Sequence, residues 1–138
     1  MEEKSARGEP RRRRRLSQEE RRFEHLVAEA IDDLPLSIRQ RLANVDVVVE
    51  DEPTPYHLAE AGLSAGESLF GLYQGIPQTQ RTAVYGMALP DKITIFRGPI
   101  ERFCRSRREI REQVRETILH EFAHHFGISD AELDDMGL

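Results

Sequence analysis

The sequence feature that most constrains the fold is an eleven-residue run, HEFAHHFGISD, from His120 to Asp130. In an α-helix successive residues are turned by about 100°, so His120 and His124 lie about 40° apart and one turn along the axis. Both imidazoles can therefore reach one metal ion. Glu121 is turned by about 100° from His120, which lets it contact a water at that ion instead of binding the ion itself. The run predicts a helix that carries a metal site.

This helix is predicted to extend from about residue 107 to residue 126. Its apolar stripe recurs every four residues, at Ile110, Val114, Ile118, Phe122 and Phe126, and is expected to face the core. Gly127 follows at once, and glycine permits the left-handed backbone with which many helices end. A turn at Gly127 would bring Asp130 back toward the histidines as a third ligand.

A set of His120, His124 and Asp130 would leave one coordination position for water, as in catalytic zinc sites. Water bound to zinc can have its pKa lowered toward about 7, and Glu121 would then act as the general base. With Cys104 as its only cysteine, the chain cannot supply a thiolate-rich site. In a chain of this composition HExxH arises by chance about 0.02 times, and adding Gly127 and Asp130 lowers this to about 10⁻⁴.

The role of Asp130 has an alternative. Ser129 to Glu132 is also a capping-box pattern for a short helix, in which Asp130 would complement the helix dipole. The acids that could replace it as a ligand are Glu132, Asp134 and Asp135. His125 is turned by about 100° from His124 and is expected at the rim of the site or behind the ligands. His25 and His57 lack a paired ligand pattern and are predicted to be structural.

The remaining elements follow from caps, periodicity and turn residues. We expect a helix from Ser17 to Pro35, helices near 37–43 and 99–104, strands at 45–49 and 91–97, a loop at 50–55, and weaker strand signals at 69–73 and 82–87. No apolar run approaches the roughly 20 residues that span a bilayer. A cytoplasmic protein is expected.

The N-terminal segment differs from the rest in composition. Residues 1–22 hold nine basic and five acidic residues, whereas the whole chain holds 20 and 25. Residues 1–16 have too few apolar side chains to offset the entropy of ordering and are predicted to be a disordered tail, with a single domain at 17–138. The arginines at Arg11–Arg15 could contact a polyanion, or could simply be a solvated run.

The motif, together with the preceding strings PDKITIFRGPIERF and LFGLYQGIP, resembles the bacterial minimal-zincin family of possible zinc metallopeptidases, the metalloprotease-like domains. The resemblance extends from about Leu16 to Leu138. It implies an α+β, minimal zincin-like fold in which a small mixed sheet packs against the HExxH helix. It also implies one zinc ion at His120, His124 and Asp130, Glu121 as the catalytic acidic residue, and a peptide or protein substrate.

By analogy with larger zincins, the strand that includes Ile93, Ile95 and Arg97 is expected to be an edge strand that binds the substrate backbone. Two other functions remain open. The domain could be a catalytically weak or inactive module that binds a peptide or nucleic acid, or it could be a metal-dependent nuclease. The general base Glu121 and the acidic body of the chain disfavour the nuclease.

Overall fold

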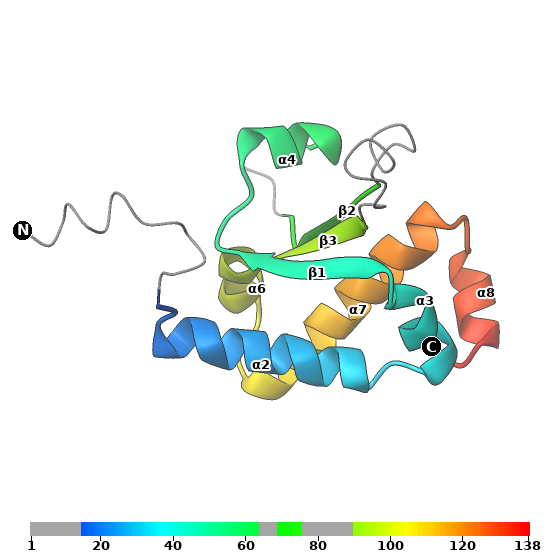
Figure 1. Cartoon of the computed structure of the whole chain (residues 1–138), viewed down its shortest axis with the longest axis horizontal. Coiled ribbons are helices and arrows are strands. Elements are labelled where there is room, and N and C mark those ends of the chain that lie inside the picture. The colour runs from blue at the N-terminus through cyan, green and yellow to red at the C-terminus, as the bar shows by residue number, and fades with distance from the viewer. Residues whose placement is uncertain (1–14, 64–68, 76–89) are drawn as a thin grey trace, which may run out of the picture.

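The computed structural model describes residues 15–63, 69–75 and 90–138 (Figure 1). The elements in chain order are α2 (Gln18–Asp32), α3 (Leu36–Leu42), β1 (Val45–Glu50), α4 (Pro55–Glu60), β2 (Gly71–Gln74), β3 (Asp91–Phe96), α6 (Arg97–Phe103), α7 (Arg107–His125) and α8 (Asp130–Asp135). Most of the predicted tail and the predicted strand at 82–87 lie outside the described residues.

The three described strands form one mixed sheet in the order β1-β3-β2. β1 and β3 are parallel, with Val45 opposite Asp91, whereas β2 and β3 are antiparallel, with Tyr73 opposite Ile93. Helix α7 packs against β2, β3 and α2. Helix α4 lies on the other side of the sheet from α2, where the His57 ring contacts Phe96 (Figure 1). The predicted α+β class, with a small mixed sheet against the motif helix, is confirmed.

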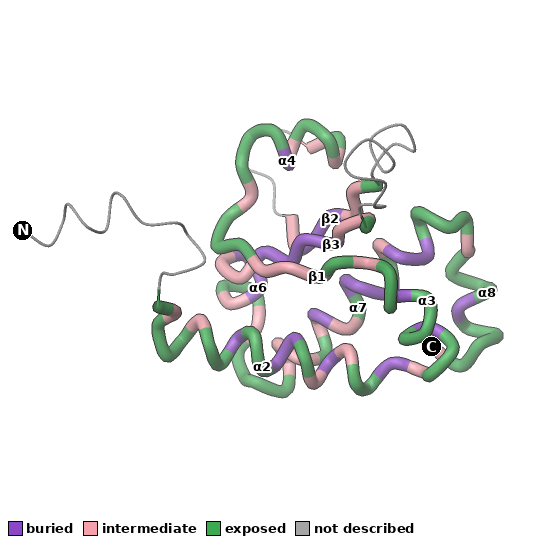
Figure 2. Tube along the Cα trace, viewed as in Figure 1, coloured by how far each residue is buried: buried purple, intermediate pink, exposed green. Residues whose placement is uncertain are grey.

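The core fills the space between the sheet, α2 and α7, where the buried residues gather (Figure 2). Val114, Ile118 and Phe122 of the predicted α7 stripe are fully buried. The prediction for Phe126 is wrong, because 48% of this residue is exposed. Phe126 is the C-cap of α7, so the helical repeat that buries the stripe ends one residue before it.

Side-chain caps begin most of the described helices, and two of these caps are predicted from the sequence. Ser17 and Ser129 each form a complete capping box, with Glu20 and Glu132 as partners. Helix α4 was not predicted: Thr54 caps it, Pro55 occupies its first turn, and the backbone N–H of Thr54 donates to His57 Nδ1 at 3.0 Å. This bond gives the buried His57 a structural role, as predicted.

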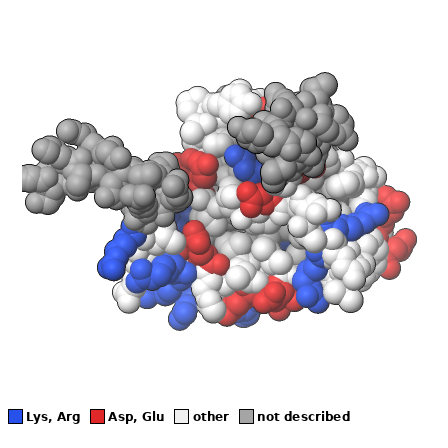
Figure 3. Space-filling view, viewed as in Figure 1, with Lys and Arg blue, Asp and Glu red and all other residues white. Residues whose placement is uncertain are grey.

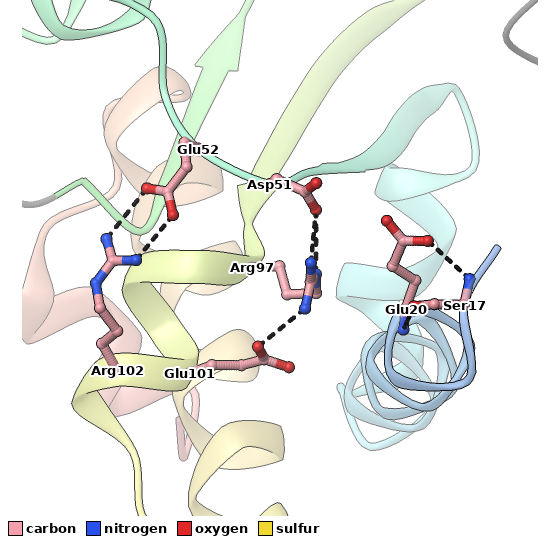
Figure 4. A network of polar contacts seen from close by, with 7 residues as sticks. All are labelled: Ser17, Glu20, Asp51, Glu52, Arg97, Glu101 and Arg102. Carbon is pink, nitrogen blue, oxygen red and sulfur yellow. Dashed lines mark hydrogen bonds and ion pairs between the residues drawn. The ribbon is translucent and has the colours of Figure 1, made fainter. Parts of the chain in front are cut away.

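The predicted edge strand is wrong. β3 is the central strand, hydrogen-bonded to β1 on one side and β2 on the other, so its backbone has no free edge for a substrate. Ile93 and Ile95 are each 0% exposed and belong to the core. Arg97 is not in the strand; it is the first residue of α6 and is ion-paired at 3.0 Å with Asp51 and Glu101 (Figure 4).

A third ion pair in this region, between Arg102 and Glu52, predicts a small dependence of stability on pH. Arg102 donates two hydrogen bonds to Glu52, at 2.8 and 3.1 Å, and this bonding lowers the pKa of Glu52 below its ordinary 4.5 (Figure 4). A lowered pKa in the folded state stabilises the protein above the unfolded pKa, and the gain is lost as the pH falls. Because both side chains are exposed, Glu52→Gln should cost less than about 1 kcal/mol at pH 7.

Urea unfolding at pH 7 and pH 3 would measure this difference. The cost of Glu52→Gln should be smaller at the lower pH, because protonation of the wild-type carboxyl removes the charge that pairs with Arg102. An equal cost at both values would show that Glu52 acts through packing and not through its charge.

Candidate metal centre

The motif helix α7 ends as the sequence predicts. Gly127 has a φ of +70°, in the left-handed region that favours glycine. The N–H of Ile128 donates to the carbonyl of Ala123 at 2.8 Å, and that of Gly127 to the carbonyl of His124 at 3.4 Å. These two bonds define a Schellman motif, which reverses the chain directly after the histidines.

After this turn, α8 folds back beside the C-terminal end of α7 (Figure 1). The capping box predicted at Ser129 is present, which makes Asp130 the first residue of α8. The same residue also faces His120: its Oδ1 lies 3.8 Å from His120 Nε2. Two atoms that share a tetrahedral zinc ion lie about 3.4 Å apart, from metal–ligand bonds of about 2.1 Å. The helix-start position and a ligand role for Asp130 are therefore compatible.

His120 has a second carboxylate on its other side. Its Nδ1 lies 3.5 Å from Oε1 of Glu116, one turn earlier in α7. A carboxylate next to one ring nitrogen commonly orients a histidine that binds a metal through the other. The position of Glu116, four residues before His120 in the same helix, is a sequence signal that could have indicated this contact.

His124 is exposed, and so are the alternative ligands Glu132, Asp134 and Asp135. Within residues 15–63, 69–75 and 90–138, no three His, Cys, Asp or Glu side chains are grouped so that they could hold a metal ion. The donor chemistry of His120, His124 and Asp130 nevertheless suits zinc, which binds imidazoles and carboxylates. His120 is 56% and Asp130 87% exposed, so neither side chain is locked by packing.

A cavity of about 280 Å³ adjoins these residues, between α7 and α8. Its polar lining includes His120, Asp130 and Asp134, and its apolar lining includes Leu119 and Leu133. Over α8 the molecular surface is rich in acidic side chains (Figure 3). Two larger cavities, of about 500 and 520 Å³, lie near Cys104 and contain no residue of the His120–His124 motif.

Glu121 lies toward the sheet, away from this cavity. Its Oε1 accepts a hydrogen bond of 2.9 Å from the backbone N–H of Tyr73 in β2. His125 lies on the same side, with its ring stacked on Tyr73 at 4.0 Å between centroids and its Nε2 3.9 Å from Asp91 Oδ2. Tyr73 and Asp91 were not predicted from the sequence. The sequence indicates these two residues only weakly, because the only sign of them is a polar group at alternate positions of a short strand.

Comparison with known proteins identifies the class to which this fold and motif belong. A family model described as zincin-like metallopeptidase matches residues 42–138, which is more than half of the chain. The chain therefore belongs to this family. A solved structure of a conserved hypothetical protein from Thermo thermophilus is similar: the two are 27% identical over 76% of this chain and 91% of that one, with a TM-score of 0.49. No curated protein matches the sequence.

No described helix combines the length and the apolar character that a membrane span requires.

Proposed function

We propose that the domain at residues 17–138 is a zinc-dependent peptidase that hydrolyses peptide or amide bonds. Membership of the zincin-like metallopeptidase family supports the peptidase class. The observation that carries the proposal is the approach of Asp130 to His120, at 3.8 Å, across the turn that follows the HExxH motif. In this proposal His120, His124 and Asp130 hold the ion, and the cytoplasmic location expected from the sequence is retained.

The ion would supply Lewis acidity at the scissile carbonyl and activate water for attack. The chain's own groups would do the rest. Glu116 orients the His120 ring through Nδ1 and leaves Nε2, the nitrogen nearer Asp130, available. Glu121 accepts the Tyr73 N–H at Oε1, so its second oxygen is the one that would take the proton from the attacking water. The cavity beside His120 and Asp130 could accommodate a substrate side chain.

The test is digestion of a peptide library by the full chain under three conditions: as purified, after chelator treatment, and after zinc is added back. We expect cleavage to be lost with the chelator and restored by zinc. Calcium added back in place of zinc is the control, because calcium prefers sets of six to eight oxygen ligands. Chelator-resistant cleavage, or no cleavage of any peptide with zinc present, would contradict the proposal.

A further inference from the structure

Strand β2 and helix α7 lie side by side with matched spacing. Alternate residues of the strand segment, at positions 71, 73 and 75, meet every fourth residue of the helix, at positions 117, 121 and 125. Two residues of a strand advance by about 6.6 Å and four residues of a helix by about 6 Å. The two repeats stay nearly in step over three contacts, so the register of β2 sets what each of these helix residues meets.

Glycine at each end of this segment permits the close approach. A Cβ added at Gly71 would lie 2.5 Å from Cγ2 of the buried Thr117, and one added at Gly75 would lie 3.2 Å from Cε1 of His125. The central contact is the hydrogen bond from the Tyr73 N–H to Glu121 Oε1, at 2.9 Å. Glu121 is thus held at the middle of a strand–helix contact whose two ends leave little space.

The side chain of Tyr73 is held on several sides. Its hydroxyl donates to Asp91 Oδ2 at 2.7 Å. Its ring is stacked on His125, with an interplanar angle of 17°, and meets the Phe126 ring edge-on at 6.1 Å. Asp91 begins β3 and Tyr73 lies in β2, so the hydroxyl bond also joins neighbouring strands of the sheet. These contacts fix the backbone of residue 73 and therefore its amide.

We propose that Tyr73 is a positioning residue for Glu121. Its ring and hydroxyl hold the backbone of β2 in place. The backbone N–H of residue 73 can then donate a hydrogen bond to one carboxylate oxygen of Glu121 and direct the other oxygen toward the proposed metal site. A hydrogen bond to a carboxylate is stronger than one between neutral groups, so this bond substantially restricts the flexible side chain of Glu121. The proposal rests on the assignment of Glu121 as general base, but the hydrogen bond between the residue 73 amide and Glu121 can be measured without any catalysis.

The first experiment follows hydrogen exchange at the amide of residue 73 by NMR, in the full chain without added metal. Glu121→Ala should speed this exchange by about 10-fold or more, because the amide loses a charged acceptor. Tyr73→Ala should do the same, and Tyr73→Phe, which keeps the ring but loses the bond to Asp91, should have a smaller effect. Unchanged exchange in Glu121→Ala and Tyr73→Ala would overturn the proposal.

The matched control is Tyr56→Phe. The Tyr56 hydroxyl also donates to a carboxylate, Glu60 Oε2 at 2.9 Å, but on the surface of α4 away from the motif. This variant should leave exchange at residue 73 unchanged. If Tyr73→Ala does not fold, Tyr73→Phe decides the side-chain role, and exchange equal to wild type in that variant would exclude it.

The second experiment uses a peptide identified in the library digestion. Tyr73→Ala should lower kcat by about 10-fold while KM and zinc affinity stay within about 2-fold, and Tyr73→Phe should recover most of the loss. A rise in KM with unchanged kcat would show that Tyr73 binds substrate and does not position the base. If wild type cleaves nothing, the peptidase proposal fails, while the exchange result still decides whether Tyr73 holds Glu121.

Discussion

Replacement of Glu121 by glutamine is expected to lower kcat by about 100- to 10,000-fold, the range that general-base catalysis usually contributes. Glutamine has nearly the same size and can still accept the Tyr73 N–H through its carbonyl oxygen, so the contact with β2 should survive. What it cannot do is take a proton from water. Zinc affinity, measured by calorimetry, should change little, because Glu121 is not one of the proposed ligands.

Glu112→Gln is the matched control for this substitution. Glu112 lies in the same helix but is exposed and paired with Arg108 at 3.0 Å, so its replacement removes a carboxylate without touching the motif. It should retain wild-type turnover. If Glu121→Gln also retained turnover, Glu121 would not be the base.

Replacement of His124 by alanine is expected to weaken zinc binding strongly. Loss of a group that only supports a ligand commonly costs 10- to 100-fold in affinity, so loss of a ligand should cost more than about 100-fold. Peptide cleavage at low free zinc should fall in parallel. Because His124 is exposed, the substitution should leave the core intact, and circular dichroism of the metal-free variant should match wild type.

His25→Ala provides the comparison for His124→Ala. His25 is also an exposed helical histidine, and its Nε2 lies 3.0 Å from Glu29 Oε2, but it belongs to α2 and lies outside the motif. Its loss should not change zinc affinity. Equal zinc affinity in His124→Ala and wild type would remove His124 from the ligand set and require another donor.

The helices were largely predictable from local signals. Ser17, Ser106 and Ser129 each cap a helix with a side-chain bond to a backbone N–H three residues later, and Gly127 ends α7 with positive φ. Such signals depend on neighbours within four residues, which the sequence displays directly. Helix α4 was missed although Thr54 followed by proline is a recognisable start signal.

The order of the strands was not predictable in the same way. The alternation at residues 91–97 indicated a strand but not its neighbours, and β3 proved to be central and not at an edge. Pairing depends on contacts between residues far apart in the chain, whose side chains carry no local signature of their partners. For the same reason the bond between Tyr73 and Glu121, 48 residues apart, could not be foreseen.

Within the candidate site, the motif placed the histidines, but the competing interpretations of Asp130 could not be separated by sequence. The structure shows why: the residue begins α8 and also faces His120 at 3.8 Å. A short helix that starts three residues after a Schellman turn makes both possible. The spacing of the motif encodes this turn. The approach of the Asp130 carboxylate to His120 depends instead on how α8 packs against the rest of the domain through its buried Leu133.

The proposed ligands belong to two segments of unequal anchorage. Helix α7 is anchored by fully buried side chains, whereas α8 has only Leu133 among its buried residues. An ion shared between them would act as a cross-link that fastens the last segment of the chain to the rest. Removal of the ion should therefore release helix α8 first and leave the remainder folded. The metal supply would then control whether the site is complete, and not whether the domain is folded.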